Sequence, residues 1–192
     1  LVQRMFTGTD SFTLLAIPLF MIAGRLMEWG GISKRLIDLS MNVVGGMYGG
    51  LANVSILACM FFAAISGSAP ATVVAIGSIM VPAMIKEGYG KSFSVAILAA
   101  AGIIGVIIPP SILFVSYGVS IGASIGKLFI AGIIPGVIMG LSLMLFCYIV
   151  SRINGWKSSV KPTFRGFLSS LKKSIWGLLM PIIILGGIYG GI

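Results

Sequence analysis

Two apolar arms joined by a short polar interruption occupy residues 49–85 of the chain. The arms hold 18 and 19 residues, and the interruption between them, Ser66-Gly67-Ser68-Ala69-Pro70, carries no charge. A helix needs about 20 residues to cross a bilayer. Non-helical backbone at membrane depth is tolerated only where it is buried in protein or lines a wet cavity. The pattern therefore predicts a re-entrant helical hairpin over 49–85, and an ordinary pair of short spans is the alternative.

The composition of the whole chain supports a membrane setting for these arms. Hydrophobic residues make up 58% of the 192, charged residues 9%, and the mean hydropathy is +1.13, whereas soluble domains carry about 25% charged residues. The predicted fold class is therefore an all-α polytopic membrane protein in a lipid bilayer. The net charge of +9 lies in short connections between apolar runs, which indicates cytoplasmic loops and lipid contact and argues against nucleic acid as a partner.

The residue types also argue against an enzyme. The chain has no histidine, which excludes acid–base catalysis and metal ligation by imidazole. The serines of the interruption have no Lys, Asp or His close to them in sequence, so a nucleophile with its base is not supported. We expect no catalytic residue.

Five segments follow from the apolar runs and the helix breakers. The run 92–122 holds 31 residues, too long for one straight crossing, and Pro109-Pro110 removes two N–H donors near its middle. The predicted segments are a first span with a cytoplasmic interfacial helix (1–48), the re-entrant hairpin (49–85), a discontinuous helix broken at Pro109-Pro110 (86–126), a transmembrane helix (127–155), and a basic interfacial segment that leads into another transmembrane helix (156–192). Both ends of the chain look like cuts through a longer protein.

The basic residues predict an orientation, because cytoplasmic loops carry the excess of Lys and Arg. If the residues before 12 lie outside, eleven of the 13 basic residues fall on the cytoplasmic face and only Arg4 and Lys127 lie opposite. The eleven are Arg25, Lys34, Arg35, Lys86, Lys91, Arg152, Lys157, Lys161, Arg165, Lys172 and Lys173. The hairpin would then enter from the cytoplasm. Trp29, Trp156 and Trp176 lie near predicted helix ends, as in an interfacial aromatic belt.

Polar and helix-breaking residues gather at two points, the hairpin tip and the Pro-Pro break. They are Ser66, Gly67, Ser68 and Thr72 at the first, and Gly105, Pro109, Pro110 and Ser111 at the second. In secondary transporters, half-helix N-termini face anions while unwound carbonyls and hydroxyls coordinate Na⁺. Neither break contains an acidic residue, which favours sodium over a proton-carrying carboxylate. Close packing of small residues is the alternative explanation for any single serine.

Six short stretches, in this order and spacing, resemble one known family, the large membrane (M) subunit of tripartite ATP-independent periplasmic (TRAP) transporters. They span most of residues 17–136 and read Ile17-Pro18-Leu19-Phe20 with Ala23-Gly24, Gly30-Gly31-Ile32-Ser33 with Arg35-Leu36, Ile65-Ser66-Gly67-Ser68-Ala69-Pro70-Ala71-Thr72, Gly77-Ser78-Ile79-Met80-Val81-Pro82, Ile107-Ile108-Pro109-Pro110-Ser111, and Ala131-Gly132-Ile133-Ile134-Pro135-Gly136. Many family members carry an acidic residue shortly after the Ser-Gly-Ser group, where this chain has Thr72 and Val73.

The resemblance implies an inverted-repeat elevator carrier of the bacterial inner membrane, of which this chain covers the first repeat. Such carriers couple Na⁺ entry to uptake of organic acids, and work with a small membrane (Q) subunit and a periplasmic substrate-binding protein. By similarity, the tip and the break would form one Na⁺ site, from Ser66, Gly67, Ser68, Gly105 and Pro109, and half of a substrate site, from Ser68, Ala69, Pro70, Thr72, Pro110 and Ser111. Another Na⁺/anion carrier with similar hairpins, or a passive channel, is the alternative.

Overall fold

The computed structural model describes residues 18–19, 22, 24–26, 29–158 and 163–190. Within these residues the regular elements are helices, joined by turns and irregular segments, with one isolated β-bridge between Tyr48 and Lys157. The predicted first span (12–29) lies mostly outside the described residues, as do Arg4 and Lys161. The helices are α3 (Ile32–Val44), α4 (Gly50–Ser66), α5 (Ala69–Lys86), α6 (Lys91–Ile103), the 3₁₀ turn η1 (Ile104–Val106), α7 (Ile112–Ile121), α8 (Ile125–Ile153) and α9 (Phe164–Gly190).

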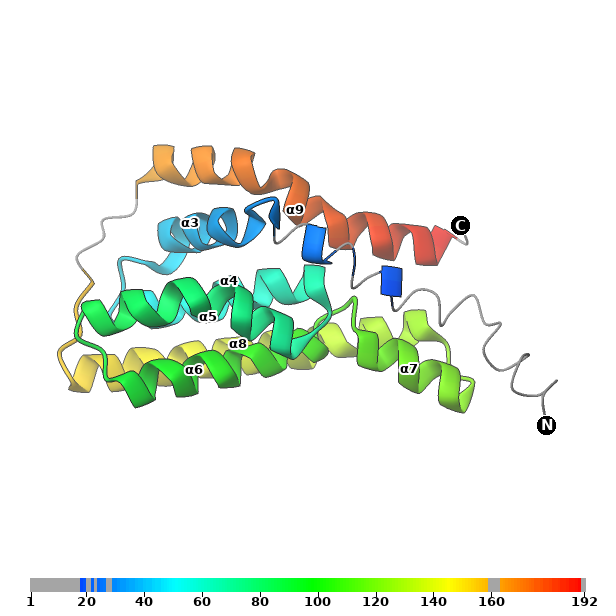
Figure 1. The fold of residues 1–192 in the computed structure, drawn as a ribbon, viewed down its shortest axis with the longest axis horizontal. Coiled ribbons are helices and arrows are strands. Elements are labelled where there is room, and N and C mark those ends of the chain that lie inside the picture. Colours follow the sequence, from blue (N-terminus) through cyan, green and yellow to red (C-terminus); the bar gives the residue numbers. More distant parts are fainter. Residues whose placement is uncertain (1–17, 20–21, 23, 27–28, 159–162, 191–192) are drawn as a thin grey trace.

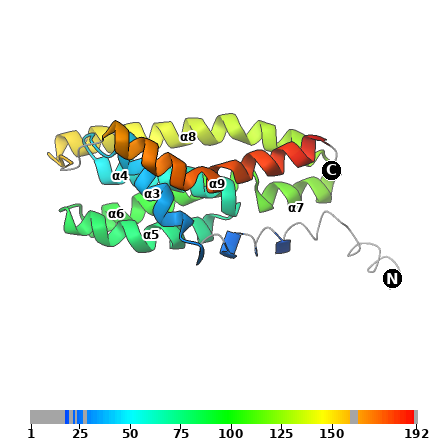
Figure 2. The same cartoon turned by 90° about the horizontal axis from the view of Figure 1, so that it is seen from above.

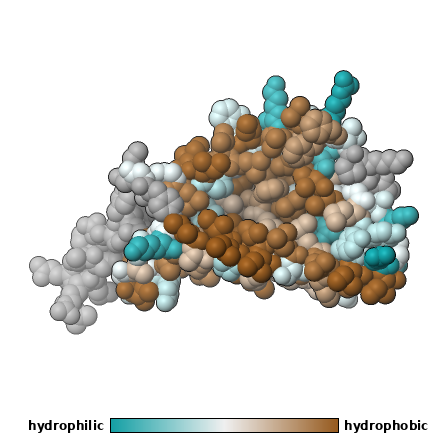
Figure 3. All heavy atoms as spheres, turned by 180° about the vertical axis from the view of Figure 1, so that it is seen from behind, coloured by the Kyte–Doolittle hydropathy of each residue, from teal (hydrophilic) through white to brown (hydrophobic). Residues whose placement is uncertain are grey.

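Three of these helices are long and apolar enough to cross a membrane. By length and composition they are Ala69–Lys86, Ile125–Ile153 and Phe164–Gly187, and α4, α6 with η1, and α7 are shorter apolar helices. Figure 3 shows apolar side chains over much of one face, with the hydrophilic ones gathered mostly toward its edges. An all-helical fold with such spans agrees with the prediction of a polytopic membrane protein.

Helix α4 forms the centre of the bundle. It lies among α3, α5, α6 and α8 (Figures 1 and 2), and Val54, Ile56 and Cys59 on it have no exposed surface. The helix is apolar all round, which is the pattern of a helix surrounded by others. One arm of the α4–α5 hairpin is therefore surrounded by protein.

The segment between α6 and α7 breaks earlier than the prolines themselves. Helix α6 ends at Ile103, η1 forms one turn, and α7 begins only at Ile112, after a cis peptide bond between Pro109 and Pro110. A proline ring clashes with the carbonyl four residues before it, which is that of Gly105 for Pro109. The α-helix must therefore stop several residues upstream of Pro109, and the break covers 104–111.

Helix α8 has two unlike faces. Its glycine face, made of Gly132, Gly136 and Gly140, lies against the side chains and backbone of Phe114, Ile107, Ile108 and Met60. The opposite side carries large exposed apolar side chains, at Ile134, Ile138, Leu141 and Leu145. Glycines let a helix approach its neighbour closely, while exposed Ile and Leu suit contact with lipid. The pattern brings α8 close to the break and turns its apolar side outward.

Helix α3 packs alongside α4 and α9, with Leu36 and Leu39 buried (Figure 1). Its amphipathic sequence, with charges at Lys34 and Arg35, fits this one-sided packing. Asn42 on α3 donates a hydrogen bond to the Ser170 hydroxyl of α9, with 3.2 Å between the donor and acceptor atoms. The position of this helix at the cytoplasmic membrane surface stays a prediction.

An aromatic cluster lies at the end of the hairpin away from its tip. Its rings come from the turn before α6, from α6 itself and from the residues after α8. The rings of Tyr89 and Trp156 lie 4.7 Å apart, and those of Phe93 and Trp156 lie 5.1 Å apart. The Gly49 N–H also donates to the Trp156 carbonyl over 3.0 Å. Burial raises the pKa of Tyr89 from its usual value near 10 to about 12. Trp156 is thus partly buried by these contacts, whereas Trp29 and Trp176 are 82% and 75% exposed.

Replacing Trp156 with alanine is expected to destabilise the full-length protein by about 2 kcal/mol, since deleting a fully buried Trp costs about 3–5 kcal/mol and this ring is partly buried. The measurement is thermal unfolding of purified protein in detergent. Trp176→Ala is the matched control, because that ring is exposed. Equal unfolding temperatures for the two variants would contradict a stabilising role for the cluster.

Candidate functional site

The hairpin tip reverses the chain in two residues. Helix α4 ends on Gly67, which has a positive φ of 60° and whose N–H donates to the Ala63 carbonyl. Ser68 is extended, with φ −137° and ψ 124°, and precedes α5, which has Pro70 in its first turn. Glycine adopts a positive φ without steric cost, and proline at the start of a helix gives up an N–H that has no helical partner. The Ser-Gly-Ser-Ala-Pro sequence thus suits a sharp turn between two helices.

Three oxygens from the two arms and the turn between them form a cluster in which both hydroxyl-bearing residues are buried. The hydroxyl oxygens of Ser66 and Thr72 lie 2.9 Å apart, and the Thr72 hydroxyl donates to the Ser68 carbonyl over 2.8 Å. The Ser66 hydroxyl also donates to the Ser68 carbonyl, over 3.3 Å. Thr72 has no exposed surface and Ser66 is 5% exposed. All three oxygens are neutral, and such oxygens are hard ligands that suit a monovalent cation.

The two helix breaks touch each other. The Ile112 N–H, at the start of α7, donates to the Gly67 carbonyl over 3.3 Å. A Cβ on Gly67 would lie 2.6 Å from the Pro110 carbonyl oxygen, and one on Gly105 would lie 2.9 Å from the Thr72 hydroxyl. Glycine is needed at both positions because backbone from the other break comes so close. The tip and the Pro-Pro break therefore form one polar centre.

Ser111 holds the far side of the break together. Its hydroxyl donates to the Val106 carbonyl over 2.7 Å and accepts from the Phe114 N–H over 3.3 Å, so it caps α7. Only 1% of this residue is exposed. These two hydrogen bonds connect the backbone at residues 106 and 114. They use the hydroxyl of Ser111, a residue predicted from the sequence to belong to the substrate site.

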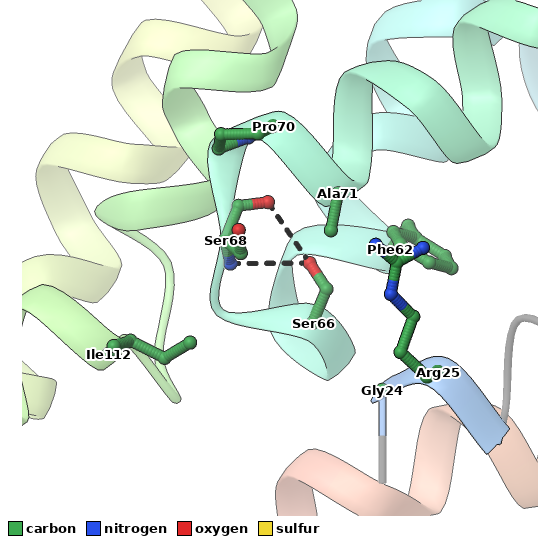
Figure 4. Close-up of a pocket in the computed structure, with 8 residues that line it drawn as sticks. All are labelled: Gly24, Arg25, Phe62, Ser66, Ser68, Pro70, Ala71 and Ile112. Atoms are coloured by element: carbon green, nitrogen blue, oxygen red, sulfur yellow. Dashed lines mark hydrogen bonds between the residues drawn. The ribbon is translucent and has the colours of Figure 1, made fainter. Parts of the chain in front are cut away.

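A cavity of about 230 Å³ opens beside the tip (Figure 4). Three of the sequence-predicted site residues line it, namely Ser66, Ser68 and Pro70. The others do not line it and lie elsewhere at the tip or within the break. Five further residues line it that we did not select from the sequence: Gly24, Arg25, Phe62, Ala71 and Ile112. An ionisable residue inside an apolar run is a signal for a functional site, and Arg25 is the only basic residue of the run 12–29.

Arg25 lies far from two other basic residues that are predicted from the sequence to lie on the same membrane face. Lys86 and Lys91 lie at the end of α5 and the start of α6. Arg25 lines the cavity at the opposite end of α5, and the 18 residues of that helix span about 27 Å. The membrane face on which each basic residue lies stays a prediction.

The helical fold, the three candidate spans and the joined breaks define a multi-pass membrane protein with an internal polar centre. Over residues 1–192 the chain matches the family model described as the tripartite ATP-independent periplasmic transporter, DctM component. The chain therefore belongs to this family of TRAP transporter large permeases. It is a transporter family and not an enzyme family.

Curated relatives agree along the whole chain. An isethionate TRAP transporter permease protein DctMQ of Oleidesulfovibrio alaskensis is 54% identical over 99% of this chain and 30% of its own length. A C4-dicarboxylate TRAP transporter large permease protein DctM of Pseudomonas aeruginosa is 47% identical over 100% and 45%. A 2,3-diketo-L-gulonate TRAP transporter large permease protein YiaN of Escherichia coli is 45% identical over 100% and 45%. The chain thus spans less than half the length of these relatives.

Proposed function

We propose that this chain forms the first half of a carrier that couples Na⁺ entry to uptake of an organic acid. The observation that carries the proposal is the contact between two helix breaks, where the Gly67 carbonyl accepts from the Ile112 N–H beside three neutral oxygens. Broken helices that meet in this way supply both partial charges and free ligands for an ion and an anion.

Sodium is the coupling ion that suits these residues. Ser66 and Thr72 offer hydroxyl oxygens and Ser68 offers a carbonyl, all within hydrogen-bonding distance of one another. Gly105 brings the second break against this cluster, and the Pro110 carbonyl oxygen of that break lies against Gly67. An oxygen set without a carboxylate favours a weakly held monovalent cation, which a carrier must also release. Ser66, Ser68 and Thr72 are the residues that would hold Na⁺.

The substrate class follows from charge and from the relatives. The cavity beside the tip is lined by one cation, Arg25, and by no acidic residue among those described, which suits an anion. The relatives are named for isethionate, C4-dicarboxylates and 2,3-diketo-L-gulonate, all of which are organic acids. We propose an organic acid anion here too, delivered by a periplasmic binding protein and moved with a small membrane subunit.

Within this proposal, the hairpin α4–α5 is re-entrant and enters from the cytoplasmic side of the bacterial inner membrane. One arm, α4, is buried among other helices, and Ser66 and Gly67 at the turn are buried too, which supports this reading because lipid does not tolerate an exposed turn. An elevator movement of the hairpin and the break as one body is the corresponding transport step. The direct contact between Gly67 and Ile112 supports that the two breaks travel together.

The test is uptake into liposomes that contain the full-length protein and its small membrane subunit, with the binding protein outside. Labelled succinate, isethionate and 2,3-diketo-L-gulonate are offered with and without an inward Na⁺ gradient. We expect accumulation of at least one of them only with the gradient. Uptake that ignores Na⁺ but follows the solute gradient would instead identify a passive channel, and would overturn the coupling.

The Thr72 hydroxyl provides a sharper test of the ion site. Thr72→Val removes the hydroxyl that donates to the Ser68 carbonyl and keeps the shape of the side chain, so we expect the Na⁺ concentration for half-maximal uptake to rise about tenfold. Thr72→Ser retains the hydroxyl and should stay within about threefold of the wild type. If Thr72→Val keeps the wild-type Na⁺ dependence, the hydroxyl cluster has a packing role only.

A further inference from the structure

The cavity at the hairpin tip is built from three segments that are far apart in sequence. Phe62, Ser66, Ser68, Pro70 and Ala71 come from the hairpin, Ile112 begins α7, and Gly24 and Arg25 come from the segment before α3. Gly24 is buried, and a Cβ on it would lie 3.6 Å from the Ser66 Cα. The backbone that carries Arg25 is thus packed directly on the tip.

Arg25 brings the only charge to this cavity among the described residues that line it. Figure 4 shows its side chain running from its own segment toward Phe62 and the start of α5, on the side where the Ser66 hydroxyl lies. A guanidinium presents several N–H donors in a planar fork that matches the two oxygens of a carboxylate or two of the three oxygens of a sulfonate.

The N-terminus of α5 adds partial positive charge to the charge of Arg25 at this cavity. Ser68 is the residue before the helix and makes no side-chain cap to it, and the 18-residue helix points its first turn at the same cavity. The unpaired N–H groups of a first turn carry partial positive charge. The Ser66 hydroxyl and the first turn of α5 therefore face the same space as the guanidinium.

The volume limits what this cavity holds. Pockets for drug-sized ligands measure about 300–1,000 Å³, so the 230 Å³ here suits a small solute or one end of a larger one. Phe62, Pro70, Ala71 and Ile112 give the cavity apolar walls, against which a short carbon chain can pack. A small anion with one carboxylate or sulfonate directed at Arg25 fits both features.

We propose that Arg25, which lies outside the hairpin, binds the carboxylate or sulfonate group of the transported solute and so makes the site selective for anions. The proposal rests on the uptake function proposed above and assigns its anion recognition to a residue beyond the two helix breaks. Because Arg25 lies on a different segment from Ser66 and Ser68, the anion bridges that segment and the tip.

The experiment measures anion binding directly, by the rise in unfolding temperature of the purified full-length protein with its small subunit. Succinate, isethionate and uncharged ethylene glycol are titrated at constant Na⁺ and constant ionic strength. We expect at least one anion to raise the temperature in a saturable way, and ethylene glycol to have no effect. In Arg25→Gln the half-effect concentration of that anion should rise at least about tenfold.

Two further variants make the result specific. Arg152→Gln removes an exposed arginine at the end of α8 that lies away from the tip, and it should behave as the wild type. Arg25→Lys keeps the charge without the fork, so its half-effect concentration should lie between those of wild type and Arg25→Gln. If Arg25→Gln does not fold, a severalfold increase in Arg25→Lys carries the same conclusion.

The proposal is overturned if neither anion stabilises the wild type, or if the folded Arg25 variants bind the anion as the wild type does. Its failure differs from failure of the proposed function. Anion binding that depends on Arg25, together with uptake that ignores a Na⁺ gradient, would leave this inference standing and remove the coupling. Na⁺-driven uptake that is unchanged in Arg25→Gln would do the reverse.

Discussion

Gly67→Ala is expected to reduce Na⁺-driven uptake by at least about tenfold while the protein still reaches the membrane. An alanine at φ 60° costs about 1 kcal/mol in backbone conformation. Its Cβ would also lie 2.6 Å from the Pro110 carbonyl oxygen, so the tip must move away from the second break. That movement lengthens the hydrogen bond between the Ile112 N–H and the Gly67 carbonyl. The measurement is initial uptake in liposomes.

Gly122→Ala is the control for this variant, because Gly122 ends α7 just as Gly67 ends α4. It has φ 69°, its N–H donates to the Gly118 carbonyl, and a Cβ on it would meet nothing within 4 Å. The control therefore carries the backbone cost without the collision. We expect it to lose some stability and to keep most of its uptake. Equal uptake by the two variants would show that contact between the breaks is not required.

Gly132→Val is expected to have the largest effect on stability, about 3 kcal/mol or more. A Cβ at this position would collide with the Ile107 carbonyl oxygen and the Phe114 ring. The first of these is backbone, which cannot rotate away, so α8 must separate from the break. Overpacking a tight interior costs about 1–3 kcal/mol and more where backbone has to shift. The measurement is the unfolding temperature of the purified full-length protein.

The matched control for Gly132→Val is Gly186→Val. Gly186 also lies inside a long apolar helix, α9, and a Cβ on it would meet nothing within 4 Å. Both substitutions change the intrinsic helix propensity by the same amount, so the comparison isolates the collision. A drop in unfolding temperature of the same size in both would indicate that α8 is not held against the break by its glycine face.

Much of the helical fold could be predicted from the sequence, because apolar runs and helix breakers are local signals. The hairpin turn was expected at Ser66-Gly67-Ser68, and the structure joins α4 and α5 there. The second break begins at Ile104, next to Gly105, which is one of the helix-breaking residues identified from the sequence. The clash of Pro109 with the Gly105 carbonyl gives the physical reason for this early start.

The candidate site was less predictable, since it depends on contacts between distant segments. Thr72 and Ser66 share a hydrogen bond because α4 and α5 pair, which spacing along a hairpin can suggest. The hydroxyl of Ser111 bonds to Val106 and Phe114, a local capping interaction, and its contact with substrate stays a prediction. The place of Arg25 at the cavity could not be predicted, because a rule based on the position of lysine and arginine in the sequence does not register tertiary contacts.

Because α8 is longer than the bilayer core is thick, the position of the polar centre depends on the thickness of the bilayer. Its 29 residues extend about 44 Å, whereas the hydrocarbon core of a bilayer measures about 30 Å. The helix must tilt, bend at Pro135 or reach into the headgroups, and each response varies with the lipid. Since the glycines of α8 touch Ile107 and Ile108 beside the prolines, any change of tilt pushes on the break. Uptake should therefore vary with the acyl-chain length of the surrounding lipid.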